Sequence, residues 1–215
     1  MQKPIISHGN PPEKNDIYEN LLKFLENVLL KFITNETAED DITQDLVIFL
    51  DEETRKQDTI FSFINQYKEG KYKVDIGVYL RSKAFIFCCI EAKRLPIPNS
   101  SKRDPREYVI VEREKYEGNG GIQRFKEGKH AKNLSLSIML GYIQDGNNSN
   151  YWFSKINTWI TELISIDKEF WNIDDCLVKY NSNKCDRYFS THKKRDNTKI
   201  ILHHFWIKLK NNKGK

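Results

Sequence analysis

The sequence contains few cysteines and no pattern that would join them. Only four occur among 215 residues, at positions 88, 89, 176 and 185. They show neither a CxxC pair nor the spacing of a zinc site, and Cys88 and Cys89 lie within a very apolar segment. We therefore expect reduced thiols that pack as small hydrophobic side chains. A chain of this length can bury a sizeable core without disulfides or a structural metal.

Long hydrophobic runs are also lacking. No apolar run approaches the roughly 20 residues of a membrane-spanning helix, and Met1 to Pro4 lead into no signal-peptide-like stretch. These absences predict a cytoplasmic protein without a membrane partner. The chain also has no P-loop, no GxGxxG after a strand and no nucleophile motif, so a small-molecule enzyme has little support.

The composition that is present is typical of a globular protein. Hydrophobic residues make up 39% of the chain, charged residues 30% and aromatic residues 12%. The 35 basic residues exceed the 30 acidic ones, which gives a formal net charge of +5. This small excess is compatible with a nucleic-acid partner but does not select one.

Hydrophobic periodicity predicts four helices in a single domain over residues 1–215. Residues 1–14 hold three of the six prolines and predict an extended arm. Helical spacing of apolar residues runs from Asp16 to about Asn35, and Thr37 can cap a second helix with an acidic first turn. A short helix is expected after Gly120, and a longer one around Trp152.

Six segments have the patterns of β-strands. The first three are separated only by Glu69-Gly70 and by residues 81–83, which predicts an antiparallel meander. The third is apolar on both faces and should be an interior strand. The expected strands are residues 59–67, 72–80, 84–93, 134–143, 187–191 and 199–209.

The hairpin register brings two carboxylates together. A three-residue loop at residues 81–83 would pair Leu80 with Ala84 and place Asp75 opposite Cys89. Glu91 would then lie on the same face as Asp75, as a diagonal neighbour roughly 7–8 Å away at the backbone. Lys93 follows two residues later on that face.

Two carboxylates and a lysine at a strand end suit phosphodiester hydrolysis. Carboxylate oxygens are ligands that Mg²⁺ or Mn²⁺ prefers, and such a metal can polarise a phosphate and activate water. Lys93 could orient that water or balance charge in the transition state. The alternative is a solvated ladder of charges, but the strand that carries Glu91 is too apolar for that to be the favoured interpretation.

The spacing of Asp75, fifteen residues and then Glu91-Ala92-Lys93 resembles the signature of the PD-(D/E)xK, or restriction-endonuclease-like, nucleases. Val74 stands in the place of the proline. The resemblance implies an α/β (α+β) fold whose αβββαβ core, about residues 16–145, holds a central mixed four-stranded sheet flanked by helices. A helix and two strands, about residues 150–210, would follow as a C-terminal extension.

The resemblance also implies an activity and further site residues. The activity is Mg²⁺- or Mn²⁺-dependent endonuclease or exonuclease cleavage, of DNA more than RNA, with restriction, phage defence or repair as the settings and a homodimer as one arrangement for cutting two strands. Asp75 and Glu91 would hold the metal, with Glu39 as a third ligand and Glu19 as the weaker candidate for that role. Gln123, after the short glycine turn, would complete the catalytic set with Lys93.

Basic residues near that turn are candidates for nucleic-acid contacts. Arg124, Lys126 and Lys129 form a cluster, and free backbone N–H groups at a helix start would suit phosphates. A solvated helix face is nearly as good an interpretation. We interpret His203 and His204 as packing residues, and His192, without a visible partner, is not expected to be a catalytic base.

A nuclease fold that binds without cutting is the second hypothesis. Such a module would bind nucleic acid or a partner protein and would have no metal affinity that depends on Asp75 and Glu91. Metal binding therefore separates the two hypotheses.

Overall fold

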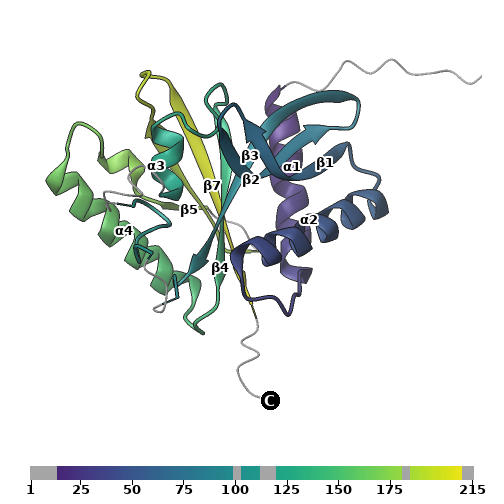
Figure 1. Cartoon of the computed structure of the whole chain (residues 1–215), viewed down its shortest axis with the longest axis horizontal. Helices are drawn as coiled ribbons and strands as arrows, with labels where there is room; N and C mark the ends of the chain where they lie inside the picture. The colour runs from purple at the N-terminus through teal and green to yellow at the C-terminus, as the bar shows by residue number, and fades with distance from the viewer. Residues whose placement is uncertain (1–13, 99–102, 112–119, 181–184, 210–215) are drawn as a thin grey trace, which may run out of the picture.

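A computed structural model describes residues 14–98, 103–111, 120–180 and 185–209. It contains one seven-stranded mixed sheet with helices on both faces. Figure 1 shows α1 and α2 together on one side of the sheet, and α3 and α4 on the other. The predicted arm lies outside the described residues except for Lys14, which begins α1.

The strand order is β1-β2-β3-β4-β7-β6-β5. β1, β2 and β3 form the predicted antiparallel meander, β4 and β7 join β3 as parallel strands, and β6 and β5 add on antiparallel. The strands are β1 (Phe61–Glu69), β2 (Tyr72–Leu80), β3 (Lys83–Leu95), β4 (Leu136–Ile143), β5 (Val178–Tyr180), β6 (Arg187–Lys193) and β7 (Lys199–Lys208).

The prediction of an α/β protein is confirmed, but the four-stranded sheet is wrong. The two predicted C-terminal strands pair within the same sheet, because β7 lies directly beside β4. β5 was not predicted, since its three residues are all exposed and too few to show a pattern. From α2 to β4 the chain does follow the predicted order of helix, three strands, helix and strand.

The helices on the first face are α1 (Lys14–Val28), a 3₁₀ turn over Leu29–Lys31 and α2 (Glu39–Lys56). Both α-helices bury the apolar stripes that their spacing predicts, including Leu21 and Leu25 in α1 and Leu46 in α2. The predicted cap is wrong: Ala38 is the N-cap of α2, without a side-chain cap. Thr37 instead offers its carbonyl oxygen to Arg94 and Gln144.

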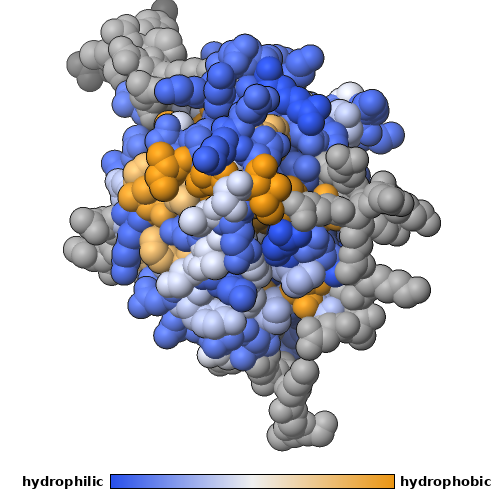
Figure 2. Space-filling view, turned by 90° about the vertical axis from the view of Figure 1, so that its left-hand side faces the viewer, coloured by the Kyte–Doolittle hydropathy of each residue, from blue (hydrophilic) through white to orange (hydrophobic). Residues whose placement is uncertain are grey.

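The second face carries α3 (Gly121–Lys126), α4 (Ser149–Ile166) and a 3₁₀ turn over Ile173–Asp175. Asn148 caps α4 by accepting a hydrogen bond from the Tyr151 N–H. The side of the molecule that carries α4 is mainly hydrophilic, and the apolar residues drawn there form separate patches (Figure 2). None of the helices within the described ranges is both long and apolar enough to cross a membrane.

Buried polar side chains tie β6 to the second face. Asp175 accepts two bonds of 2.7 Å from Lys126 Nζ and lies 2.6 Å from His192 Nδ1. His192 Nε2 in turn lies 2.6 Å from Ser190 Oγ. The sequence-based view that His192 lacks a partner is therefore wrong. This serine, histidine and aspartate have the order of a hydrolytic triad, but all three are buried, so they act in the core rather than on a substrate.

His203 gives the fold a defined sensitivity to acid. Its ring accepts hydrogen bonds from the Arg187 guanidinium, and burial together with that positive charge lowers its pKa to about 3. The unfolded chain, with a histidine pKa near about 6.5, binds the extra proton between these two values, so stability falls as the pH drops through this window.

We expect His203→Gln to reduce this loss. Between pH about 7.5 and about 5, His203 alone accounts for up to about 2 kcal/mol of lost stability. Urea unfolding at both pH values should show a smaller loss for the variant than for the wild type. Equal losses in the two proteins would show that His203 is not responsible.

Candidate active site

The site begins where β2 and β3 separate. Their paired register ends at Ile76 and Ile90. One residue beyond, the Asp75 carboxylate accepts a 2.7 Å hydrogen bond from the Ala92 N–H, so a side chain takes the position of a strand partner. The Asp75 carboxylate therefore lies between β2 and β3, just beyond the point where their main-chain pairing ends.

The predicted register differs in detail. Gly77, not Asp75, pairs with Cys89, because the turn has two residues, Arg81 and Ser82, and β3 bulges twice near Tyr79. The resulting shift is even, two residues in total. An even shift keeps each side chain on its predicted face, so Asp75 and Glu91 still meet.

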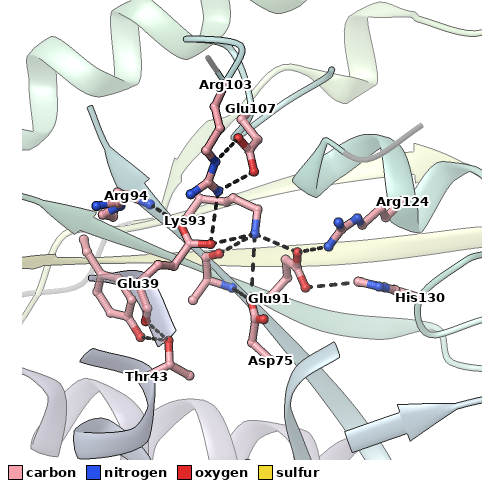
Figure 3. A network of polar contacts seen from close by, with 12 residues as sticks. Glu39, Thr43, Asp75, Glu91, Lys93, Arg94, Arg103, Glu107, Arg124 and His130 are labelled. Carbon is pink, nitrogen blue, oxygen red and sulfur yellow. Dashed lines mark hydrogen bonds and ion pairs between the residues drawn. The ribbon is translucent and has the colours of Figure 1, made fainter. Parts of the chain in front are cut away.

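Lys93 lies at the centre of three carboxylates (Figure 3). Its Nζ is 2.8 Å from Glu91 Oε1, 3.3 Å from Glu39 Oε1 and 3.9 Å from Asp75 Oδ2. It also donates a 2.7 Å hydrogen bond to the carbonyl oxygen of Ala92. With 3% of its side chain exposed, Lys93 is a buried cation held by buried and half-buried anions.

Glu91 is fully buried, which contradicts the interpretation of a solvated ladder. Its Oε1 accepts a 2.6 Å hydrogen bond from Arg124 Nη1 in addition to the contact with Lys93. Its Oε2 lies 3.3 Å from His130 Nδ1, but this pair does not form a hydrogen bond. Within the described residues, Glu91 Oε2 is therefore a buried acceptor without a hydrogen-bond partner, which is costly unless a ligand satisfies it.

Glu39 reaches the site from the first residue of α2. Its Oε2 accepts a 3.0 Å hydrogen bond from the Arg94 N–H, and its Oε1 accepts a 3.3 Å hydrogen bond from Arg103 Nη2. Arg103 is held in turn by both carboxylate oxygens of Glu107. The N-terminus of α2 and the segment from Arg103 to Glu107 thus meet over the end of β3.

Burial and charge give the three carboxylates different pKa values. Burial, reinforced by the charge of Glu91, raises the pKa of Asp75 to about 8. Burial also disfavours the ionised forms of Glu91 and Glu39, but Lys93 and other cations outweigh it and lower the pKa of both. The same anions overcome burial at Lys93 and raise its pKa. These shifts favour the charged form of Lys93 and the protonated form of Asp75.

The structure separates the predicted contact residues. Arg124 lies in the site, but Lys126 is fully buried in its pair with Asp175, so the prediction that Lys126 contacts nucleic acid is wrong. Lys129 pairs with Glu127 at 2.6 Å. The N–H groups of Gly121, Ile122 and Gln123 donate to carbonyl oxygens of residues 107–109, so the expected free donors at the start of α3 are occupied.

Gln123 does not touch the acidic cluster. Its side chain accepts a hydrogen bond from the Val111 N–H and donates one to Glu127. Glu19, the weaker candidate for a third ligand, is an exposed residue of α1, whereas Glu39 contacts Lys93. Gln123 therefore supports the segment that leads into α3 and is not placed beside the reacting groups.

Sequence reasoning missed Arg103, Glu107 and His130. Arg103 and Glu107 are a basic and an acidic residue four apart, a spacing that favours an ion pair on one helical turn, but nothing in the sequence places that pair against Glu39. His130 approaches Glu91 from the connection between α3 and β4, beside Phe125. Its position depends on the α3–β4 connection, whose conformation has no sequence pattern of its own.

The carboxylates fit a divalent cation in their chemistry. Three acidic side chains from α2, β2 and β3 converge, and Glu91 Oε2 offers an unsatisfied lone pair. In the part of the chain that the structure describes, however, no three His, Cys, Asp or Glu side chains are already arranged to hold a metal. Lys93 Nζ lies between these carboxylates, so a metal requires the ammonium to withdraw.

No family model matches this chain, and no match is found among curated proteins or solved structures.

Proposed function

We propose that this chain is a metal-dependent nuclease of the PD-(D/E)xK kind that hydrolyses phosphodiester bonds in DNA. The observation that carries the proposal is the convergence of Asp75, Glu91 and Lys93 at the point where β2 and β3 separate. The order of elements from α2 to β4 supports it, because the chain follows the helix, three strands, helix and strand that the resemblance implies.

Asp75, Glu91 and Glu39 would hold Mg²⁺ or Mn²⁺, which supplies Lewis-acid polarisation of the phosphate and a more acidic water. Burial keeps Glu91 fixed and dry, and Arg124 holds one of its oxygens in place. Asp75 must lose its proton to become a ligand, so metal binding should release protons near neutral pH.

Among the described residues, Lys93 is the cation that contacts all three carboxylates, and it is the natural group to orient an attacking water. Its Nζ has three N–H donors, and in this structure they face anions and the Ala92 carbonyl oxygen. Arg103 contacts Glu39 and Arg124 contacts Glu91 (Figure 3), and both add positive charge beside the position that a phosphate would take.

One observation favours the second candidate, a nuclease fold that binds without cutting. The chain's own cations already neutralise the carboxylates, because Lys93, Arg103 and Arg124 each contact Glu39 or Glu91. A stable internal salt-bridge cluster of this kind needs no metal. Calorimetry with Mn²⁺ separates the candidates: a nuclease should lose its metal affinity on Glu91→Gln, and a binding module should have no such affinity.

The proposed function is tested with a neighbouring pair of variants on α2. Glu39→Gln should slow Mg²⁺-dependent cleavage at least about tenfold, because it removes a charge that the metal site needs. Asp40→Asn, one residue further along and exposed, should leave cleavage unchanged. A panel of single-stranded, double-stranded and RNA substrates, with EDTA controls, provides the assay.

The absence of cleavage of any substrate by the wild-type protein with Mg²⁺ or Mn²⁺ would overturn the proposal. Equal effects of the two substitutions would remove Glu39 from the site and leave the role of Asp75 and Glu91 to be tested in the same panel.

A further inference from the structure

A hollow opens on the face of the sheet that carries Glu91. The hollow has two adjoining parts. The first has a volume of about 520 Å³ and the second a volume of about 480 Å³. That first part, which we call the aromatic hollow, is lined chiefly by Ile64, Tyr67, Tyr79, Phe85, Ile86 and Cys89. Its floor therefore comes from all three strands of the meander.

The aromatic hollow and the candidate active site share strand β3. Cys89 pairs with Gly77, and Glu91 follows Cys89 by two residues, about 7 Å along the same face of β3. Gly77 allows the side chains of Ile86 and Tyr67 to pack over the strand at this point. A Cβ at position 77 would lie 2.9 Å from both Ile86 Cδ1 and Tyr67 Cβ, which is too close. The hollow therefore lies about the length of one or two nucleotides from Glu91, which is itself buried and does not line it.

Part of the floor is apolar surface in contact with solvent. Phe85 is 53% exposed and Ile64 is 41% exposed, and Tyr67 and Tyr79 are half-buried beside them. Exposed aromatic and aliphatic side chains that line one concavity are uncommon on a protein surface unless they bind something. Flat rings with one open face suit the stacking of nucleobases.

The second part, which we call the basic rim, has a volume of 480 Å³ and shares Glu69 and Asn133 with the hollow. Five of its lining residues are cationic and three are acidic. Lys194 is buried, and its Nζ donates to three backbone carbonyl oxygens, so the other four cations leave an excess of one positive charge. The cations are Lys71, Lys129, Lys132, Lys194 and Arg195, and the acids are Glu69, Glu127 and Asp196. Glu69 is held by the N–H groups of Ala131 and Lys132, and Glu127 contacts Lys129 and Arg195.

We propose that the aromatic hollow and the basic rim bind a single-stranded segment of DNA, with bases stacked on Phe85 and its neighbours and phosphates along the rim. An aromatic floor beside a row of cations is the arrangement that single strands use, whereas paired bases in a duplex cannot offer their faces to Phe85. This inference rests on the proposed function and narrows its substrate to DNA with unpaired nucleotides next to the scissile bond.

The test measures binding without cleavage. Fluorescence anisotropy in EDTA, with a labelled oligodeoxythymidine of about 12 nucleotides, reports single-strand affinity for the full chain. Phe85→Ala should weaken this binding about 5- to 150-fold, the range for loss of one base–aromatic stack, and Phe85→Trp should preserve it. Ile48→Ala, at an equally exposed apolar residue on α2, should have no effect.

The basic rim is tested by the salt dependence of the same binding. Lys132→Gln should reduce the slope of log affinity against log salt by about 0.7, and Lys23→Gln, on α1 at the opposite face, should not. Three results would each overturn the inference. Phe85→Ala could bind the single strand as tightly as the wild type does, it could lose as much affinity for a matched duplex as for the single strand, or the protein could self-associate through this face.

The outcomes also distinguish this inference from the proposed function. If Asp75→Asn abolishes cleavage while Phe85→Ala still binds the oligonucleotide normally, the nuclease stands and the aromatic hollow does not. If Phe85 controls single-strand binding and no metal-dependent cleavage occurs, the hollow stands and the nuclease does not.

Discussion

Lys93→Met should bind Mn²⁺ more tightly than the wild type and cleave DNA at least about 100-fold more slowly. Metal affinity rises and the cleavage rate falls because Lys93 both competes with the metal and assists the reaction. Its ammonium lies 2.8 Å from Glu91 and 3.3 Å from Glu39, so it competes with a metal for both carboxylates. The same ammonium is the group placed to orient water. Methionine keeps the volume of the side chain and removes the charge.

Isothermal titration calorimetry and a cleavage assay on the same protein preparation measure the two effects. Metal affinity should rise at least about fivefold, since the competing charge is gone from a buried site. Lys83→Met, at the exposed start of the same strand, is the control and should change neither quantity. Circular dichroism with Mn²⁺ present checks that the variant is folded. A loss of both metal binding and cleavage in a folded variant would contradict the competition that we infer.

The largest effect on stability is expected at Asp175. Asp175→Ala should lower the free energy of unfolding by about 3–5 kcal/mol, because it strands the buried ammonium of Lys126 and removes the partner of His192. It also removes the hydrogen bond that Asp175 accepts from the Asn172 N–H. Urea unfolding monitored by tryptophan fluorescence measures the change.

Asp174 provides the matched control for this experiment. It precedes Asp175 in the same 3₁₀ turn but is exposed, so Asp174→Ala should change the free energy of unfolding by less than about 0.5 kcal/mol. Asp175→Ala with Lys126→Met should recover part of the loss, since the double variant leaves no unpaired charge in the core. A similar loss for both single aspartate variants would show that the turn, and not the buried pair, determines the stability.

Much of the site was predictable because strand periodicity is insensitive to small errors. The hairpin loop was predicted one residue too long and the bulges near Tyr79 were not foreseen, but the total shift was even. Asp75, Glu91 and Lys93 therefore reached one cluster as expected. The role of Glu39 was predicted only through a family resemblance, since nothing in its local sequence indicates that α2 begins beside β3.

What the sequence did not reveal depends on contacts between distant residues. Lys126 looked like a neighbour of Arg124 in an exposed basic cluster, yet its partner is Asp175, 49 residues away in an irregular turn. His192 looked unpartnered for the same reason. Local composition reports charge but not the direction of a side chain. On a short helix, two residues, about half a turn, separate the partly exposed Arg124 from the buried Lys126.

The sheet order has a consequence for how the chain is made. β7, which ends at Lys208, lies between β4 and β6 and is bonded to both. During synthesis, β4 therefore emerges long before its parallel partner exists, and its open edge must wait for some 60 residues to follow. An unpaired strand whose side chains are mostly apolar invites pairing with other nascent chains. We expect the emerging polypeptide to depend on chaperone cover until β7 has left the ribosome and has been inserted into the middle of the sheet.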